Sequence, residues 1–254
     1  MFDNTVTRFP PGLNNTKENG ILSDMFIPDR IWKVHEYSND FDQYIAGDWT
    51  LSGAGATAAL IAGDGGLLLV SAAVSTFASL QKLPANYQLA KGFRTWFEER
   101  AALDSLVGVL LVGLLNATAT PFTPASQTDG AYFLSITATG ALTFNIAVGG
   151  VITTVQCGVN LVAGLQAKLA FYYDAAVYAA GFPNGRVLWE ASGPGVTAPA
   201  RGEIVVPVAS VFPGAVNLAE TLAVNAPTAV VRTLTVDTLY AAKDRTNINA
   251  TPAF

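Results

Sequence analysis

The chain has 254 residues, of which 51% are hydrophobic and only 13% carry a charge. Because soluble domains are typically about 25% charged, this composition predicts a large core, a large contact surface or both. The net charge of −5 argues against a nucleic-acid-binding surface, which needs basic residues to neutralise phosphates. The longest uninterrupted apolar run, residues 106–115, is too short for a membrane-spanning helix, which takes about 20 residues.

Residues 1–30 contain no hydrophobic period, and their apolar side chains occur singly between proline, glycine and asparagine residues. A disordered tail is usually more uniformly polar and charged, so we expect an extended arm that lies against folded protein. A strap over the chain's own domain is the alternative to an arm on a neighbour. The N-terminus has neither the basic nor the apolar region of a secretory signal peptide. The expected partner contacts in the arm are Phe2, Arg8, Phe9, Pro10, Leu13, Met25 and Phe26.

The next segment alternates between apolar and polar residues, which is typical of β-strands. Strands are predicted around residues 32–37 and 47–50. A hairpin is predicted over residues 60–71, with its turn at the glycine-rich residues 63–66. Residues 72–86 show no clear period, and we expect a loop or a single helical turn there.

Residues 92–100 form the most polar predicted strand. Alternation places Glu99 on one face of this strand and Glu98 on the other. The apolar residues 106–115 are expected to form a buried strand whose glycines allow a neighbouring strand to approach closely. A loop rich in threonine, proline and serine follows at residues 118–130.

Residues 168–191 contain three runs of alternating aromatic and branched side chains, which predict a meander in the middle of one sheet. Roughly a dozen short strands and no amphipathic helix predict an all-β sandwich or barrel. We interpret residues 31–254 as a single β-sandwich domain. Further strands are predicted at residues 131–138, 141–148, 151–157, 203–211 and 222–239.

No group of residues has the pattern of a catalytic or metal site. His35 is the only histidine, which excludes most Ser-His-Asp and multi-histidine sites, and alternation places it on the solvent side of its strand. Glu98 and Glu99 point to opposite faces, so they cannot act as the paired carboxylates of a glycosidase. The single Cys157 indicates a buried small residue and fits synthesis in a reducing compartment.

Several short motifs follow one another along the chain. They are Asp129-Gly130-x-x-Phe133, Leu169-x-Phe171-x-Tyr173-Asp174, and an Asn184-Gly185 turn followed by Val187-x-Trp189. In this order they resemble the concanavalin-like, LamG-like jelly-roll sandwich. The resemblance implies a β-sandwich of two antiparallel sheets. The strand GFRTWFEER lacks the acidic spacing of the glucanases of this superfamily, and no Asp/Asn cluster like that of its metal-binding lectins is found.

Residues 40–49 (DFDQY…GDW) and Thr235-Val236-Asp237 with Arg245 are similar to capsid decoration, or cement, proteins of tailed bacteriophages. This resemblance implies a non-enzymatic virion structural protein that binds the outer surface of an icosahedral phage capsid and stabilises it. The implied partners are the phage major capsid protein and copies of the chain itself, as a dimer or trimer. No cofactor, nucleic acid or membrane is implied, and synthesis would take place in the host bacterial cytoplasm.

Two other functions remain open for this fold. The first is a glycan-binding, lectin-like module of a virion or a secreted protein, with exposed aromatic residues on one face. The second is a polysaccharide hydrolase or lyase in which Glu99 and Asp237 converge across strands. The aromatic candidates for the first function are Trp96, Tyr172, Tyr178 and Trp189.

Overall fold

The computed structural model describes residues 34–41, 43–61, 67–71, 76–89, 93–136, 138–174, 185–205, 216–228 and 230–244. The predicted arm of residues 1–30 lies outside these ranges, as do Tyr178 and Arg245. The seven expected partner contacts of the arm therefore lie outside the described residues: Phe2, Arg8, Phe9, Pro10, Leu13, Met25 and Phe26.

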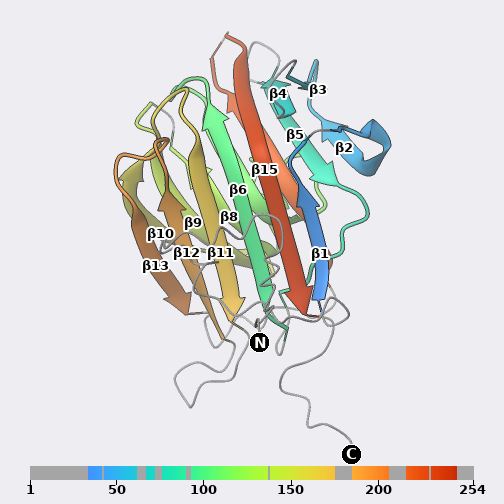
Figure 1. Cartoon of the computed structure of the whole chain (residues 1–254), viewed down its shortest axis with the longest axis vertical. Helices are drawn as coiled ribbons and strands as arrows, with labels where there is room; N and C mark the ends of the chain where they lie inside the picture. Colours follow the sequence, from blue (N-terminus) through green and yellow to red (C-terminus); the bar gives the residue numbers. More distant parts are fainter. Residues whose placement is uncertain are drawn as a thin grey trace, which may run out of the picture.

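The described strands form two antiparallel sheets that pack face to face, with sheet A in front and sheet B behind it in Figure 1. Sheet A contains, in spatial order, β13 (Ala200–Val205), β12 (Arg186–Ser192), β11 (Ala167–Asp174), β6 (Thr95–Leu103), β15 (Arg232–Asp244), β4 (Leu67–Ser71) and β3 (Thr57–Leu60), and β1 (Val34–Asn39) pairs with β15. Sheet B contains β10 (Val151–Asn160), β9 (Ala141–Val148), β8 (Gly130–Ser135), β7 (Val109–Asn116), β14 (Leu218–Ala226), β5 (Thr76–Lys82) and β2 (Trp49–Ser52). Two short 3-10 helices are η2 (Ala46–Asp48) and η3 (Pro124–Ser126). The predicted jelly-roll sandwich of two antiparallel sheets is confirmed.

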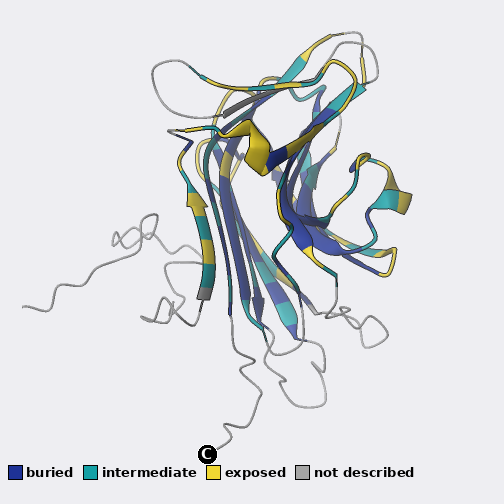
Figure 2. Cartoon of the chain, turned by 90° about the vertical axis from the view of Figure 1, so that its right-hand side faces the viewer, coloured by how far each residue is buried: buried dark blue, intermediate teal, exposed yellow. Residues whose placement is uncertain are grey.

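The space between the sheets is filled by aromatic and branched side chains from both. Figure 2 colours much of the length of the packed strands as buried. Phe97 and Phe171 stack side by side on sheet A with ring centroids 5.1 Å apart. Phe144 on sheet B lies 5.6 Å from Phe171 and 6.4 Å from Trp189, so these rings join the two sheets. Burying one such side chain stabilises the fold by about 1.5–3 kcal/mol.

The long strand β15 organises sheet A, because three strands share its two edges. Along one edge of β15, residues 234–243 pair with β6, and β6 pairs with β11 on its other side. On the opposite edge, β4 pairs with residues 232–236 and β1 pairs with residues 239–244. The strand β1 therefore begins where β15 ends, at the lower end of the sandwich in Figure 1.

The prediction that residues 72–86 form a loop or a helical turn is wrong, because β5 lies there. The strand shows no period-two pattern because four consecutive residues are buried, and so both of its faces are covered. On the outer face, Phe77 packs against Phe122 with ring centroids 6.2 Å apart. The Gln81 side chain there accepts a hydrogen bond from the Thr118 amide (2.9 Å).

The hairpin over residues 60–71 is confirmed, since Leu60 pairs with Leu67. Of the predicted meander at residues 168–191, β11 and β12 pair directly with each other, and the middle run lies outside the described residues. In the described part of the chain, no helix has the length and apolar character needed to cross a bilayer.

Candidate functional site

A pocket of about 320 Å³ opens at the end of the sandwich where β1 begins and β15 ends. The antiparallel register of these strands pairs His35 with Lys243, which puts an imidazole beside an ammonium group. The connection from β5 to β6 passes the same end and adds two primary amides and an aromatic ring. The lining residues are His35, Asn86, Gln88, Phe93, Lys243 and Asp244.

Tyr87 fixes this connection between the two sheets. Its backbone N–H donates to Leu218 O on sheet B (3.1 Å), and its hydroxyl donates to Ala241 O on sheet A (3.1 Å). Because neighbouring side chains of an extended segment point to opposite sides, the burial of Tyr87 in the core directs Asn86 and Gln88 away from it. The pocket wall is therefore held by a buried anchor.

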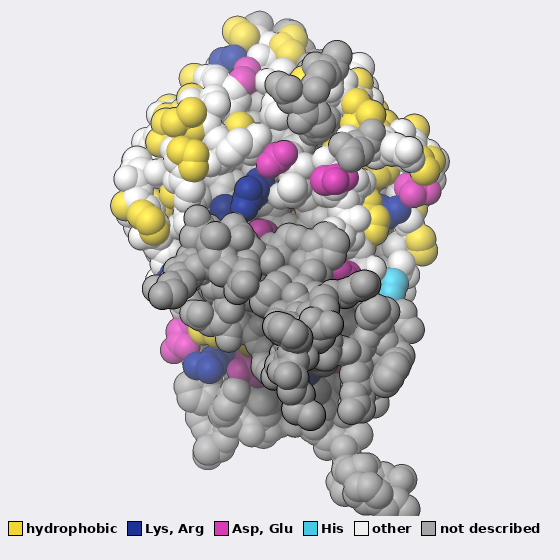
Figure 3. All heavy atoms as spheres, viewed as in Figure 1, with side chains coloured by type: hydrophobic (Ala, Val, Ile, Leu, Met, Phe, Trp, Pro, Cys, Tyr) yellow, Lys and Arg dark blue, Asp and Glu magenta, His cyan; other side chains and the backbone are white. Residues whose placement is uncertain are grey.

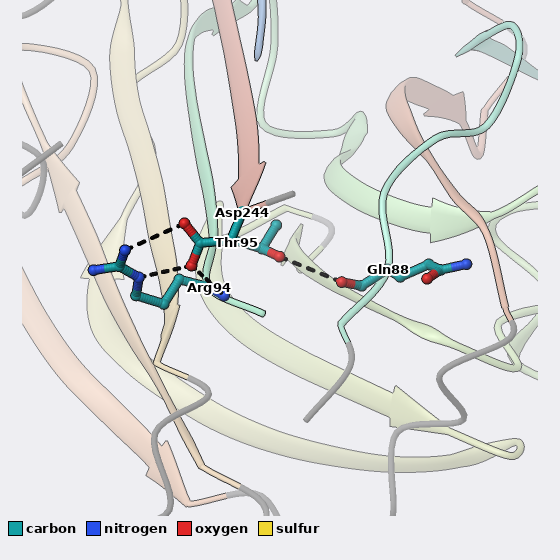
Figure 4. A network of polar contacts seen from close by, with 4 residues as sticks. All are labelled: Gln88, Arg94, Thr95 and Asp244. Carbon is teal, nitrogen blue, oxygen red and sulfur yellow. Dashed lines mark hydrogen bonds and ion pairs between the residues drawn. The ribbon is translucent and has the colours of Figure 1, made fainter. Parts of the chain in front are cut away.

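Asp244, which lines the pocket, is held in a clamp by Arg94 (Figure 4). The Asp244 carboxylate accepts hydrogen bonds from the Arg94 Nε (2.7 Å), Nη2 (3.2 Å) and backbone N–H (3.1 Å). Next to the clamp, the Thr95 hydroxyl donates to Gln88 O (3.4 Å), which ties the connection to β6. The charge of Asp244 is therefore already compensated within the protein.

The prediction that His35 lies on the solvent side of its strand is wrong. On β1, His35 and Tyr37 are partly buried, whereas Glu36 and Ser38 are exposed. The cause is aromatic packing, since His35 lies 5.7 Å from the Tyr87 ring and Tyr37 lies 6.4 Å from the Trp49 ring. Alternation along β1 was correctly expected, but its direction depends on contacts with residues far away in the sequence.

The four predicted aromatic residues do not form one exposed face. Trp96 and Tyr172 do stack on the outer face of sheet A (5.4 Å), but Trp96 is only 1% exposed. Trp189 lies in the core, where its ring closely contacts Gly202. Tyr178 lies outside the described residues.

The prediction that Glu98 and Glu99 occupy opposite faces is confirmed. Glu98 lies on the outer face of sheet A and forms an ion pair with Lys168 (3.3 Å), and Figure 3 shows basic side chains next to acidic ones on this face. Glu99 is 0% exposed in the core. Burial raises the pKa of both carboxyls, and Lys168 partly offsets the effect at Glu98.

The carboxylate pair proposed for a hydrolase does not form between Glu99 and Asp237. Glu99 pairs across the sheet with Leu239, and Asp237 lies at the register shift of β15. Cys157 is buried as predicted, and burial raises the pKa of its thiol to about 12, which makes the thiolate scarce at neutral pH. Within the described ranges, no cluster of His, Cys, Asp and Glu could hold a metal ion.

The motif residues that carry the family resemblance build the fold. The Asp129 carboxylate accepts a hydrogen bond from the Gly149 amide (3.1 Å), and Phe133 lies in the core. In the segment of residues 40–49, Phe41 and Trp49 are buried in the core. The described residues of these motifs therefore belong to the sandwich, and none of them lines the pocket.

No protein-family model matches this chain, and no curated protein has a matching sequence. Solved structures with the same fold do exist. Winged bean acidic lectin, in complex with methyl-α-D-galactose, is 9% identical with a TM-score of 0.58, over 84% of this chain and 99% of the lectin. An endo-1,3-β-glucanase from Streptomyces sioyaensis is 10% identical with a TM-score of 0.56, over 86% of this chain and 99% of the enzyme.

A protein of unknown function from Shewanella oneidensis MR-1 is 12% identical with a TM-score of 0.53, over 96% of this chain and 100% of that protein. At these identities the likeness shows the fold alone, and this fold is the predicted concanavalin-like jelly roll. The fold is shared by lectins and by a glucanase, so by itself it does not decide between binding and catalysis.

Proposed function

We propose that the protein is a non-enzymatic, lectin-like module that binds a carbohydrate in the pocket at the end of β1 and β15. The observation that carries the proposal is the convergence of the pocket's side chains. The Asn86 amide can donate to and accept from sugar hydroxyls. The Gln88 amide donates to Asn217 Oδ1 (2.7 Å) and keeps its second N–H and its carbonyl oxygen for a ligand. The Phe93 ring offers an apolar surface. The volume of about 320 Å³ lies within the usual range of small-molecule sites. The likeness to a galactoside-bound lectin supports this choice of ligand class.

A glycan array followed by isothermal titration calorimetry tests this function with the full chain. We expect saturable binding of at least one class of saccharide. The substitution Gln88→Ala should weaken that binding about ten-fold, which corresponds to the loss of about one hydrogen bond. The control is Gln156→Ala, because Gln156 is an exposed glutamine on β10, outside the pocket lining. Folded protein that binds no saccharide would contradict the proposal.

A second candidate is a virion protein that decorates the exterior of a tailed-phage capsid and also contacts copies of itself. The similarity of residues 40–49 to decoration proteins favours it, together with an apolar surface patch around the same segment. Leu83 donates its amide to Asp48 O, and Asp48 donates to Ile45 O, so these residues are neighbours. Ile45 is 60% exposed and Leu83 is 45% exposed. A partner that covered this patch would bury apolar surface.

Co-sedimentation of the full chain with undecorated, expanded tailed-phage capsids tests this second function. We expect saturable binding at a fixed ratio to the shell subunit, because decoration occupies symmetry-related sites. The substitution Ile45→Ser should lower the affinity by removing apolar contact, whereas Val151→Ser, at an equally exposed apolar position on β10, should not. A folded protein that stays in the supernatant at every concentration would rule out capsid decoration.

A further inference from the structure

We infer that the ligand of this pocket is an anionic saccharide, whose acidic group is bound by the ammonium group of Lys243. This inference rests on the proposed carbohydrate-binding function and specifies the class of sugar. It follows from the charge balance among the residues that line the pocket.

Lys243 is held at the pocket by the register of β15. The preceding residues on the same face of the strand, Leu239 and Ala241, lie in the core. Lys243 continues this inward face, and it pairs with His35 on one side and Thr95 on the other. Its ammonium group is therefore directed toward the opening between the sheets and has only partial access to water.

None of the ion pairs found among the described residues includes Lys243. Burial accordingly lowers the pKa of this lysine, and no carboxylate of the described residues raises it. Among the described residues that line the pocket, Asp244 is the one acidic side chain, and it forms its ion pair with Arg94. With Arg94 counted, the described residues at the pocket supply two positive groups, Arg94 and Lys243, and one negative group, Asp244, so their net charge is +1, although the chain as a whole has a net charge of −5.

A partly desolvated ammonium group without a counter-ion is costly, and an anion that enters the pocket offsets this cost. A lysine acts as a point charge and selects an anion without fixing its shape. The amides of Asn86 and Gln88 can bind the hydroxyls of the same ligand. This combination fits a sugar that carries a carboxylate or a sulfate better than it fits a simple inorganic anion, which would leave the Asn86 amide and the second N–H of Gln88 without a ligand group.

Calorimetry with matched trisaccharides tests the inference with the full chain. The probes are trigalacturonate, its methyl ester, which has the same rings without the charge, and a sulfated galactose trisaccharide. We expect one or both anionic probes to bind at least about ten-fold more tightly than the ester in low salt. The difference should shrink as sodium chloride is raised, because salt screens the attraction. The two anionic probes together identify which acidic group is preferred.

The substitution Lys243→Met should abolish the preference for the anionic probes, and Lys243→Arg should keep most of it. Arg100→Met is the matched control, because it removes one positive charge from an exposed position on β6. If Lys243→Met does not fold, Lys243→Gln and the salt dependence of the wild-type protein give the same comparison. Equal binding of ester and anionic probes would overturn the inference and leave the carbohydrate function standing. Failure of all three probes, in a protein that binds other neutral glycans on the array, would also overturn it. A protein that binds no saccharide at all would overturn the proposed function as well.

Discussion

Replacing Glu99 with leucine is expected to raise the free energy of unfolding by about 3 kcal/mol at pH 8. The Glu99 side chain is 0% exposed, and neither of its carboxyl oxygens has a hydrogen-bond partner among the residues that the structure describes. Its neighbours across the sheet are Leu169 on β11 and Leu239 on β15. A leucine at this position would place an apolar side chain of similar size among apolar ones. Chemical denaturation followed by tryptophan fluorescence measures the change.

The gain in unfolding free energy from Glu99→Leu should increase as the pH rises. Burial raises the pKa of Glu99 well above the value of 4.5 of an ordinary glutamate, so the folded state binds its proton more tightly than the unfolded state. The stability that this proton contributes is complete below about pH 4.5 and is lost as the pH rises toward the folded-state pKa. The advantage of Glu99→Leu over the wild type should therefore grow by up to about 1.4 kcal/mol per pH unit above pH 4.5.

Two further variants separate ionisation from packing. Glu99→Gln keeps the shape of the side chain without the charge, so it should remove the same pH dependence but give less stability than leucine at pH 5. Glu203→Gln changes an exposed glutamate on β13 and should leave the profile close to that of the wild type. If the unfolding free energies of Glu99→Gln and the wild type changed with pH in parallel, Glu99 would not be the source of the pH dependence. The remaining slope should come partly from Glu220, whose pKa burial raises to about 7.

The fold could be predicted from the sequence because several strands, such as β10 and β15, alternate between more buried and less buried residues. Period-two alternation then identifies both the strand and its inward side, as it does for Leu169, Phe171 and Tyr173 on β11. It fails at β5, where the loop after β7 covers the outer face and leaves Ser79 and Gln81 buried as well. A strand that is covered on both sides loses the alternating pattern.

The candidate pocket could not be predicted in the same way. Its lining comes from the start of β1, the connection before β6 and the end of β15, and only the folded chain brings these segments together. These segments are far apart in the sequence, and their spacing matches no motif that could be recognised in advance. One local signal was present, since Lys243 follows Leu239 and Ala241 at inward-facing positions of β15. A charged residue in line with core positions indicates the open end of a sandwich, where solvent or a ligand can reach the charge.

The substitution Gly113→Ala is expected to destabilise the protein by about 3 kcal/mol or more. A Cβ atom at Gly113 would lie 2.4 Å from Ala131 O and 2.6 Å from Tyr132 Cα, both in the backbone of the adjacent strand β8. The φ angle of +153° at Gly113 adds strain for any residue with a side chain. The predicted role of the glycines in residues 106–115, close approach of a neighbouring strand, is confirmed at this position. Urea unfolding followed by circular dichroism measures the loss.

The strand β8 has little room to move away from such a Cβ atom, because its other edge pairs with β9 and the Tyr132 hydroxyl donates to Gln127 Oε1 (2.6 Å). The clash must therefore be relieved by breaking hydrogen bonds between β7 and β8, in the middle of sheet B. Gly47→Ala is the matched control, since a Cβ atom there would meet no atom within 4 Å. That variant should stay within about 0.5 kcal/mol of the wild type. Equal stability of the two variants would mean that β7 and β8 lie further apart in solution than the structure places them.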